Sequence, residues 1–226
     1  MTWTGEGSQP ERPRGEPIVN LPSLTLALIV VNLAIHGLLS LADANTANWI
    51  VGTFGTTPAR YLGGPPGDTL SLLAAPFASM FLHGGWVHVG VNMASLAAYG
   101  SPLERVLGWR RYLGFYVVTG LAGDLLHVAL HATSDVPVIG ASGAISGLFG
   151  GLVIIMRFNG ELRGLLPLVV VYLVTQVGFG LMFTAPGGGG IAWAAHLGGF
   201  FAGMALIWPF MRGRLRTIAG WRGDRD

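Results

Sequence analysis

Six apolar stretches, separated by shorter polar segments, constrain this chain more than any other feature of its sequence. A helix rises about 1.5 Å per residue, so about 20 residues cross the ~30 Å hydrocarbon core of a bilayer. With 51% hydrophobic and only 11% charged residues, the chain is too apolar for a soluble domain. We therefore expect an all-α membrane protein, a bundle of six transmembrane helices over residues 21–41, 86–100, 112–130, 142–156, 165–183 and 191–211.

Two of these stretches, 86–100 and 142–156, are too short to cross the hydrocarbon core as straight helices. We expect the first to extend upstream by a few residues. The second begins at Ser142, and we expect that start to lie below the outer surface of the membrane. Irregular backbone at that depth is tolerated only beside protein or a water-filled cavity.

The charged residues predict how the chain is oriented in the membrane. All thirteen basic residues are arginines, and with six crossings only Arg60 falls on the side opposite the termini. Because cytoplasmic segments carry an excess of Lys and Arg, we expect both termini to be cytoplasmic. Arginines that flank apolar stretches set topology, so the net charge of +2 does not indicate nucleic-acid binding. The richness in Ala, Gly and Arg without Lys favours a bacterial plasma membrane.

We divide the chain into three parts. Residues 1–20 form a polar tail, residues 21–211 form the membrane domain, and residues 212–226 form a basic tail. The largest outer loop, 42–85, is rich in glycine, proline and apolar residues but poor in charge. Such a composition is unusual for a solvated loop, so we expect it to lie partly in the membrane interface.

A serine and a histidine are predicted to meet inside the membrane domain. Six crossings make the second, fourth and sixth helices run in the same direction, so residues near their starts share a depth. Ser142 opens the fourth helix, and His196 lies in the second turn of the sixth. Glycines at four-residue spacing on both helices allow the two backbones to approach closely. Because a serine hydroxyl needs a base at neutral pH, we expect a Ser–His dyad.

Two further polar residues lie at the same depth on the second helix. His88 and Asn92 are four residues apart and therefore share one helix face. Together with the free backbone N–H of Ser142, they are candidate donors to an oxyanion. Taken singly, each residue has a structural explanation, since serine and asparagine hydrogen-bond within membrane helices and interior histidines pack. Their convergence on three parallel helices favours a chemical function.

The sequence contains two other candidate sites. Ser146 is a rival nucleophile, but we expect its hydroxyl to bond to the Ser142 carbonyl. The third helix carries Asp124, His127 and His131 on one face, which is a candidate proton relay or metal site. We favour a self-neutralising Asp–His pair there, and Asp124 as an orienter of His196 is a less favoured alternative. We expect no metal and no cofactor, because the chain has no cysteine and no H-E-x-x-H motif.

At four places the sequence resembles the rhomboid family of intramembrane serine proteases. The spacing His83-x4-His88-x3-Asn92 is similar to a segment of the family's second helix. Gly140-Ala141-Ser142-Gly143 resembles its G-x-S-G motif, and Ala195-His196-Leu197-Gly198-Gly199 its sixth-helix histidine–glycine motif. Residues 100–108, which contain Glu104-Arg105, resemble the cytoplasmic turn that follows the second helix.

This resemblance implies hydrolysis of a peptide bond in a transmembrane segment of another protein, within the lipid bilayer. It makes Ser142 the nucleophile and His196 the general base and acid. His88 and Asn92 become the oxyanion side chains with Gly140 beside them, and the substrate enters near the second and fifth helices. The resemblance gives His83 a supporting role. Ser146 stands where some relatives have an aromatic residue against the catalytic histidine.

Two alternatives remain open at this stage. The first is a noncatalytic rhomboid-like protein that binds transmembrane helices. The second is a small transporter that uses Asp124, His127 and His131, although the sequence has no inverted repeat to support it.

Overall fold

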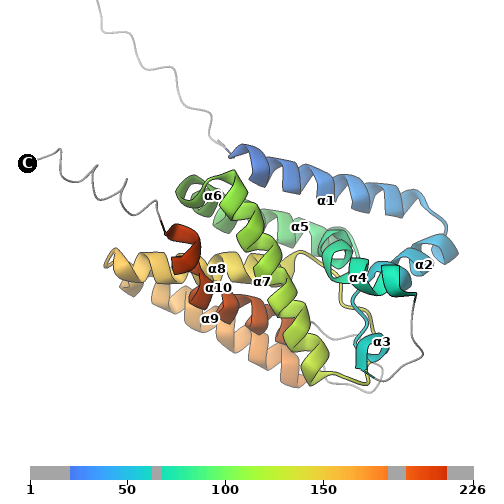
Figure 1. Ribbon diagram of the computed structural model, residues 1–226. Helices are drawn as coiled ribbons and strands as arrows, with labels where there is room; N and C mark the ends of the chain where they lie inside the picture. The colour runs from blue at the N-terminus through green and yellow to red at the C-terminus, as the bar shows by residue number, and fades with distance from the viewer. Residues whose placement is uncertain (1–20, 63–67, 183–191, 213–226) are drawn as a thin grey trace, which may run out of the picture.

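The computed structural model describes residues 21–62, 68–182 and 192–212, and these residues form an all-helical bundle (Figure 1). An isolated bridge joins Thr56 to Val138, and no longer strand occurs in the described ranges. The helices are α1 (Ser23–Leu41), α2 (Ala44–Phe54), α3 (Ala59–Leu62), α4 (Thr69–Ala78), the 3₁₀ turn η1 (Ser79–Phe81), α5 (Trp86–Ser95), the π-helical turn η2 (Leu96–Gly100), α6 (Ser101–Leu107), α7 (Trp109–Leu130), α8 (Ser142–Phe158), α9 (Leu162–Met182) and α10 (Trp193–Met211).

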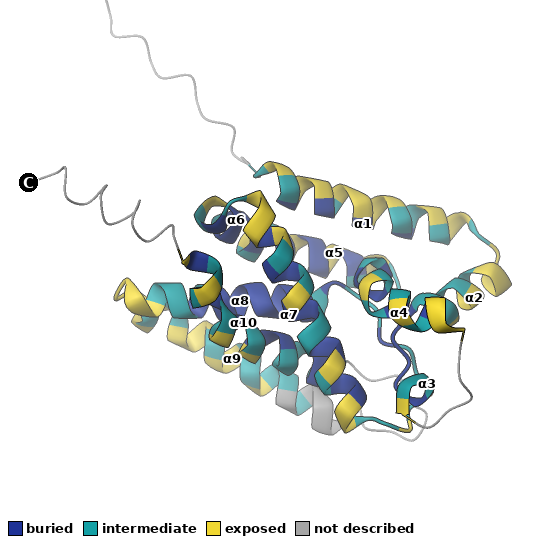
Figure 2. Cartoon of the chain, in the orientation of Figure 1, coloured by how far each residue is buried: buried dark blue, intermediate teal, exposed yellow. Residues whose placement is uncertain are grey.

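Helix α8 is the most buried helix of the bundle's interior and packs against both α7 and α10, which also pack against each other. Most of its side chains are buried, whereas α1 shows much exposed surface (Figure 2). Glycines explain the close packing of α8 on α10: a methyl group on Gly199 or Gly203 would overlap the carbonyl oxygen of Gly143 or Gly147, respectively. The two helices that are predicted to carry the dyad are therefore in backbone contact.

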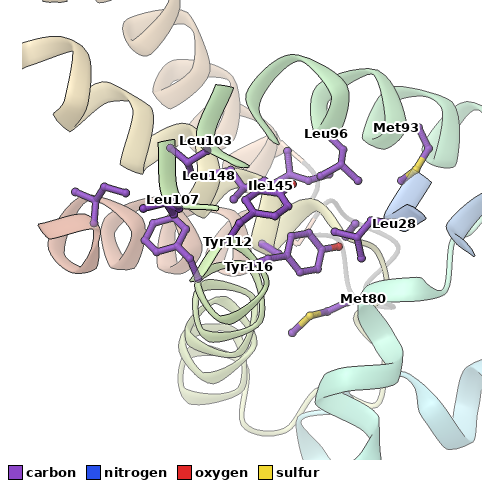
Figure 3. Close-up of a cluster of buried hydrophobic side chains, with 14 of the residues drawn as sticks. Leu28, Met80, Met93, Leu96, Leu103, Leu107, Tyr112, Tyr116, Ile145 and Leu148 are labelled. Atoms are coloured by element: carbon purple, nitrogen blue, oxygen red, sulfur yellow. The ribbon is translucent and has the colours of Figure 1, made fainter. Parts of the chain in front are cut away.

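The hydrophobic core lies on the side of α8 that faces α5, α6 and α7. Tyr112, Phe115 and Tyr116 of α7 are fully buried there, and they pack with Ile145 and Leu148 of α8 (Figure 3). The remaining members come from several elements and include Leu28, Met80, Met93, Leu96, Leu103 and Leu107. This core holds α8 in place along its length.

The helices α5, α8 and α10 run in the same direction, as the alternation of crossings predicts. Figure 1 shows the start of α1, helix α6 and the end of α10 at one end of the bundle, with α2, α3 and α4 toward the other. The beginnings of α5, α8 and α10 therefore lie toward the end of the bundle that carries the loop helices.

Within the part of the chain that the structure describes, three helices, α1, α7 and α10, are each long and apolar enough to cross a membrane. A fourth crossing exists if the bent pair 69–81 and 86–107 counts as one. The helix α8 and the segment Leu162–Gln176 are apolar but shorter. The chain is a multi-pass membrane protein, and the count of six crossings stays a prediction.

The second crossing does not extend upstream as a continuous helix, because α5 begins at Trp86. The chain bends by 78° between 69–81 and 86–107, with two glycines at the break. Gly85, the last residue before α5, has an extended backbone at φ 159°. The extra length lies downstream instead, because the helix continues from α5 through η2 into α6.

The outer loop 42–85 is more regular than its composition suggests, since it holds α2, α3, α4 and η1. Asp43 and Asp68 accept backbone N–H groups at the starts of α2 and α4. Asp68 accepts from the N–H groups of Leu70 and Ser71, and these two hydrogen bonds lower the pKa of its exposed carboxyl. Trp49, Leu70 and Leu73 remain exposed on this loop, which suits the predicted interfacial location. The tail 1–20 and residues 213–226 lie outside the described residues.

Candidate active site

Ser142 is the first residue of α8, directly after a turn that only glycine adopts easily. Gly140 has φ +121°, a backbone conformation that is strained for other residues. Ala141 caps the helix without a side-chain hydrogen bond, and Ile145 is the first residue whose N–H donates within the helix, to the Ala141 carbonyl. The N–H groups of Ser142, Gly143 and Ala144 therefore have no acceptor within α8.

The structure brings Ser142 and His196 together. The distance from Ser142 Oγ to His196 Nε2 is 2.7 Å, which is hydrogen-bonding distance. His196 lies in the first turns of α10, where its own N–H donates to the Ala192 carbonyl. Both residues are half-buried.

The other ring nitrogen of His196 contacts a residue that our reading of the sequence missed. Nδ1 lies 2.5 Å from Oε1 of Gln176 on α9. A polar side chain inside the apolar stretch 165–183 was the signal that could have revealed it, because such groups in membrane helices tend to be functional. An amide oxygen only accepts, so Nδ1 carries the proton and Nε2 is left to accept from the Ser142 hydroxyl.

His88 lies close to the backbone that precedes Ser142. A methyl group on Gly140 would lie 2.9 Å from His88 Nε2 and 3.5 Å from Ser142 Oγ, so the ring and the hydroxyl both face Gly140. The Gly84 N–H donates to His88 Nδ1 at 3.3 Å. Because Nδ1 accepts, the neutral ring carries its proton on Nε2, the nitrogen that faces Gly140.

Three other predicted site residues have structural partners. The Asn92 amide donates to the His88 carbonyl at 3.0 Å, which uses one of its two N–H groups. The Gly140 N–H donates to the Ser79 carbonyl, so it is not free to hold an oxyanion. His83 is buried, with its ring 5.0 Å from that of His88 in an edge-on contact, and neither of its ring nitrogens has a hydrogen-bond partner.

Ser146 donates its hydroxyl to the Ser142 carbonyl at 2.7 Å, as the sequence predicts. It is therefore engaged within α8. An aromatic residue from α9 contacts the histidine instead: Tyr172 donates its hydroxyl to the His196 carbonyl at 3.4 Å. Its ring packs against Phe149 and Phe200.

The alternative site on α7, formed by Asp124, His127 and His131, is not arranged as the sequence predicts. Asp124 accepts hydrogen bonds from the hydroxyls of Thr56, at 2.7 Å, and Ser79, at 3.2 Å. His127 and His131 stack on each other with ring centroids 4.2 Å apart. Asp124 thus pairs with two hydroxyl groups, neither with a histidine of its own helix nor with His196. Among the described residues, no group of three or more His, Cys, Asp or Glu side chains is placed to hold a metal ion.

Comparisons with known proteins agree with this architecture. A family model described as the rhomboid domain matches residues 73–213. RHOMBOID-like protein 4 of Arabidopsis thaliana is 33% identical over 148 residues, which are 65% of this chain and 35% of that protein. Rhomboid protease GluP of Bacillus subtilis is 28% identical over 190 residues, 83% of this chain and 36% of that protein. Rhomboid-type serine protease 2 of Emericella nidulans is 32% identical over 155 residues, 65% of this chain and 30% of that protein.

The chain is thus similar to one part of these relatives. It spans between 30% and 36% of the lengths of the three. The match to the rhomboid-domain model extends over the helices that carry Ser142, His196, His88 and Asn92.

Proposed function

The chain belongs to the rhomboid family, and we propose that it is an active intramembrane serine endopeptidase that cleaves transmembrane segments of other membrane proteins. The observation that carries the proposal is the 2.7 Å contact between Ser142 Oγ and His196 Nε2. If the His196 ring only packed against its neighbours, neither of its tautomers would be preferred. Here Nδ1 faces the Gln176 oxygen, which leaves Nε2 as the acceptor that a general base requires.

In the proposed first step, the Ser142 hydroxyl gives its proton to His196 Nε2 while Oγ bonds to the carbonyl carbon of the substrate. The π electrons of the carbonyl move onto its oxygen, which becomes an oxyanion. We propose that three kinds of donor stabilise this charge: the free N–H groups at the start of α8, His88 Nε2–H beside Gly140, and the second amide hydrogen of Asn92, whose first binds the His88 carbonyl. Such preorganised donors are worth about 10²–10³-fold each in kcat.

In the second step, the tetrahedral intermediate collapses and the bond from carbon to nitrogen breaks. His196 Nε2–H protonates the departing amine, and the acyl group stays on Ser142. A water molecule then gives a proton to Nε2 and attacks the acyl carbon, and the same proton returns to Oγ as the acid is released. No metal or cofactor takes part in this scheme.

The proposed partners are a protein substrate with a transmembrane helix and the lipid bilayer, without nucleic acid. A helical backbone hides its carbonyls in hydrogen bonds, so small or helix-weakening residues around the cut would favour attack. We further propose a bacterial plasma membrane, cytoplasmic termini, and a membrane domain over residues 21–211. The twelve arginines on the side of the termini support this orientation.

The test is to compare three variants of the full chain on a model transmembrane substrate. Ser142→Ala and His196→Ala are expected to abolish cleavage. Ser146→Ala is the matched control, because it removes a hydroxyl one turn along the same helix that is bound to a carbonyl, and it is expected to cleave. Cleavage by both Ser142→Ala and His196→Ala would refute the assignment.

A fluorophosphonate, which reacts with activated serines, separates this proposal from a noncatalytic helix-binding protein. Labelling of the wild type that disappears in Ser142→Ala supports an enzyme whatever its natural substrate. A wild type that binds transmembrane helices but neither labels nor cleaves would instead establish the noncatalytic alternative.

A further inference from the structure

Helix α9 contacts His196 at two points that are one helical turn apart. Gln176 Oε1 lies 2.5 Å from the ring Nδ1, and the Tyr172 hydroxyl lies 3.4 Å from the backbone carbonyl of the same histidine. Residues four apart share a helix face, so one face of α9 holds both the ring and the main chain of His196. Most of the other side chains on α9 are apolar, and several point to the exterior.

Resting on the proposed function, we propose that Gln176 is the positioning residue of this site: it accepts the Nδ1 proton of His196 and thereby fixes the ring orientation and the tautomer that leave Nε2 free for Ser142. This is the structural task of the aspartate in a Ser–His–Asp triad, carried out here by a neutral amide. Gln176 contacts Nδ1, the ring nitrogen of His196 that does not face Ser142, so its effect passes through His196.

The membrane explains why an amide suits this position. A carboxylate inside a bilayer is expensive unless it is paired, whereas a neutral amide accepts the same hydrogen bond without a buried charge. The cost is that an amide stabilises the imidazolium less than a carboxylate would. The ionisable groups that act on His196 are His88 on α5 and His127 on α7. Neither supplies a negative charge, so Gln176 is the acceptor that holds the ring.

Three variants of the full chain separate positioning from simple packing. Gln176→Met keeps the length of the side chain and removes the acceptor, whereas Gln176→Glu keeps the acceptor and adds a charge. Thr175→Val is the matched control, because it also makes α9 more apolar while its hydroxyl bonds only to the Tyr172 carbonyl within the helix. General-base catalysis contributes about 10²–10⁴-fold, so losing only its alignment is expected to slow Gln176→Met roughly 10- to 100-fold in cleavage and fluorophosphonate labelling.

The pH profile gives a readout that packing alone would not move. A carboxylate beside the ring stabilises the imidazolium, so Gln176→Glu is expected to stay active and to shift the acid limb of the labelling profile about one unit or more to higher pH. Thr175→Val should keep both the rate and the profile of the wild type. Wild-type rates in Gln176→Met, or an unshifted acid limb in Gln176→Glu, would overturn the proposal.

The tautomer can be measured without any turnover. Nitrogen NMR of the chain with ¹⁵N-labelled histidine distinguishes protonated from unprotonated ring nitrogens, and the His196 signals are assigned by their loss in His196→Ala. We expect a proton on Nδ1 in the wild type and a mixture of tautomers in Gln176→Met. A proton on Nε2 in the wild type would refute the positioning role. If the wild type neither cleaves nor labels, the proposed function fails, while this measurement still decides the role of Gln176.

Discussion

His88 and His196 have the same side chain but hold their protons on opposite nitrogens. At His196 the Gln176 oxygen takes the Nδ1 proton, so Nε2 accepts; at His88 the Gly84 N–H occupies Nδ1, so Nε2 donates. Both Nε2 atoms lie near Ser142. A single neighbour on the far side of each ring thus makes one histidine suited to remove a proton and the other suited to stabilise negative charge.

We predict that replacing His88 with Phe lowers kcat by about 10²–10³-fold, the usual loss for one oxyanion donor. Phe keeps an aromatic ring against Gly140 and His83, so KM should change much less than kcat. Steady-state cleavage of a transmembrane substrate measures both constants. His36→Phe is the control: His36 is also a buried histidine, packed on Trp86 and without a hydrogen-bond partner on either nitrogen. Equal losses in the two variants would point to packing instead.

These residues show most clearly which parts of the site can be predicted from the sequence and which cannot. Ser142 and the two histidines stand out because polar groups are rare and costly in apolar stretches, and shared helix direction predicts their depth. The contact between Gln176 and His196 could not be predicted, because the sequence does not give the rotation of α9 about its axis. The Gly84 N–H that binds His88 Nδ1 and the Ser79 carbonyl that binds the Gly140 N–H depend on backbone geometry outside the long helices. Residue spacing does not encode that geometry.

At the scale of elements, α6 holds the start of α1 through one buried side chain. The Glu104 carboxyl accepts from the Leu24 N–H at 3.0 Å, and from the Thr25 N–H and hydroxyl at 2.7 and 2.8 Å. These N–H groups belong to the first turn of α1, where no acceptor exists within the helix. The bond therefore joins two elements that are 80 residues apart in the chain.

We predict that Glu104→Ala lowers the free energy of unfolding by about 2–4 kcal/mol, since it leaves buried donors on α1 without an acceptor. Unfolding in mixed detergent micelles measures the change. Glu161→Ala, at an exposed glutamate, is the matched control and should change stability by less than about 0.5 kcal/mol. A Glu104→Ala protein as stable as this control would show that water replaces the carboxyl group at no cost.

Hydropathy finds the long helices because burial in lipid dictates their composition, and α7 and α10 begin and end close to the predicted positions. It fails for the outer loop, where α2 and α4 are short helices within glycine- and proline-rich sequence. The signals there are local ones: Asp43 and Asp68 accept N–H groups two and three residues ahead, as helix-capping residues do. The 78° bend near Gly84 and Gly85 is likewise a local feature of the backbone, which a hydropathy profile does not register.

Across the whole molecule, the loop before Ser142 is fixed by segments far away in the chain. Thr56 pairs with Val138 through both backbone groups, and Gly140 donates to the Ser79 carbonyl. Asp124 on α7 then joins Thr56 to Ser79 through their hydroxyls. The outer loop is thus part of the scaffold that sets the backbone at the start of α8, which gives Asp124 a structural task.

The glycine contacts between α8 and α10 set the distance between the two halves of the dyad, and this predicts the effect of Gly203→Ala. The added methyl group would overlap the Gly147 carbonyl oxygen, so the helices must separate. Overpacking of this kind costs about 1–3 kcal/mol, and a shift of about 1 Å at a reacting pair can cost about 10²-fold in rate. We therefore expect a lower midpoint of thermal unfolding and much slower fluorophosphonate labelling of Ser142, measured well below that midpoint.

The control is Gly37→Ala on α1, where the new methyl group has no atom within 4 Å. This variant should label normally, with stability equal or up to about 1 kcal/mol higher. If Gly203→Ala labels as fast as Gly37→Ala, the backbone contact does not control the distance between Ser142 and His196.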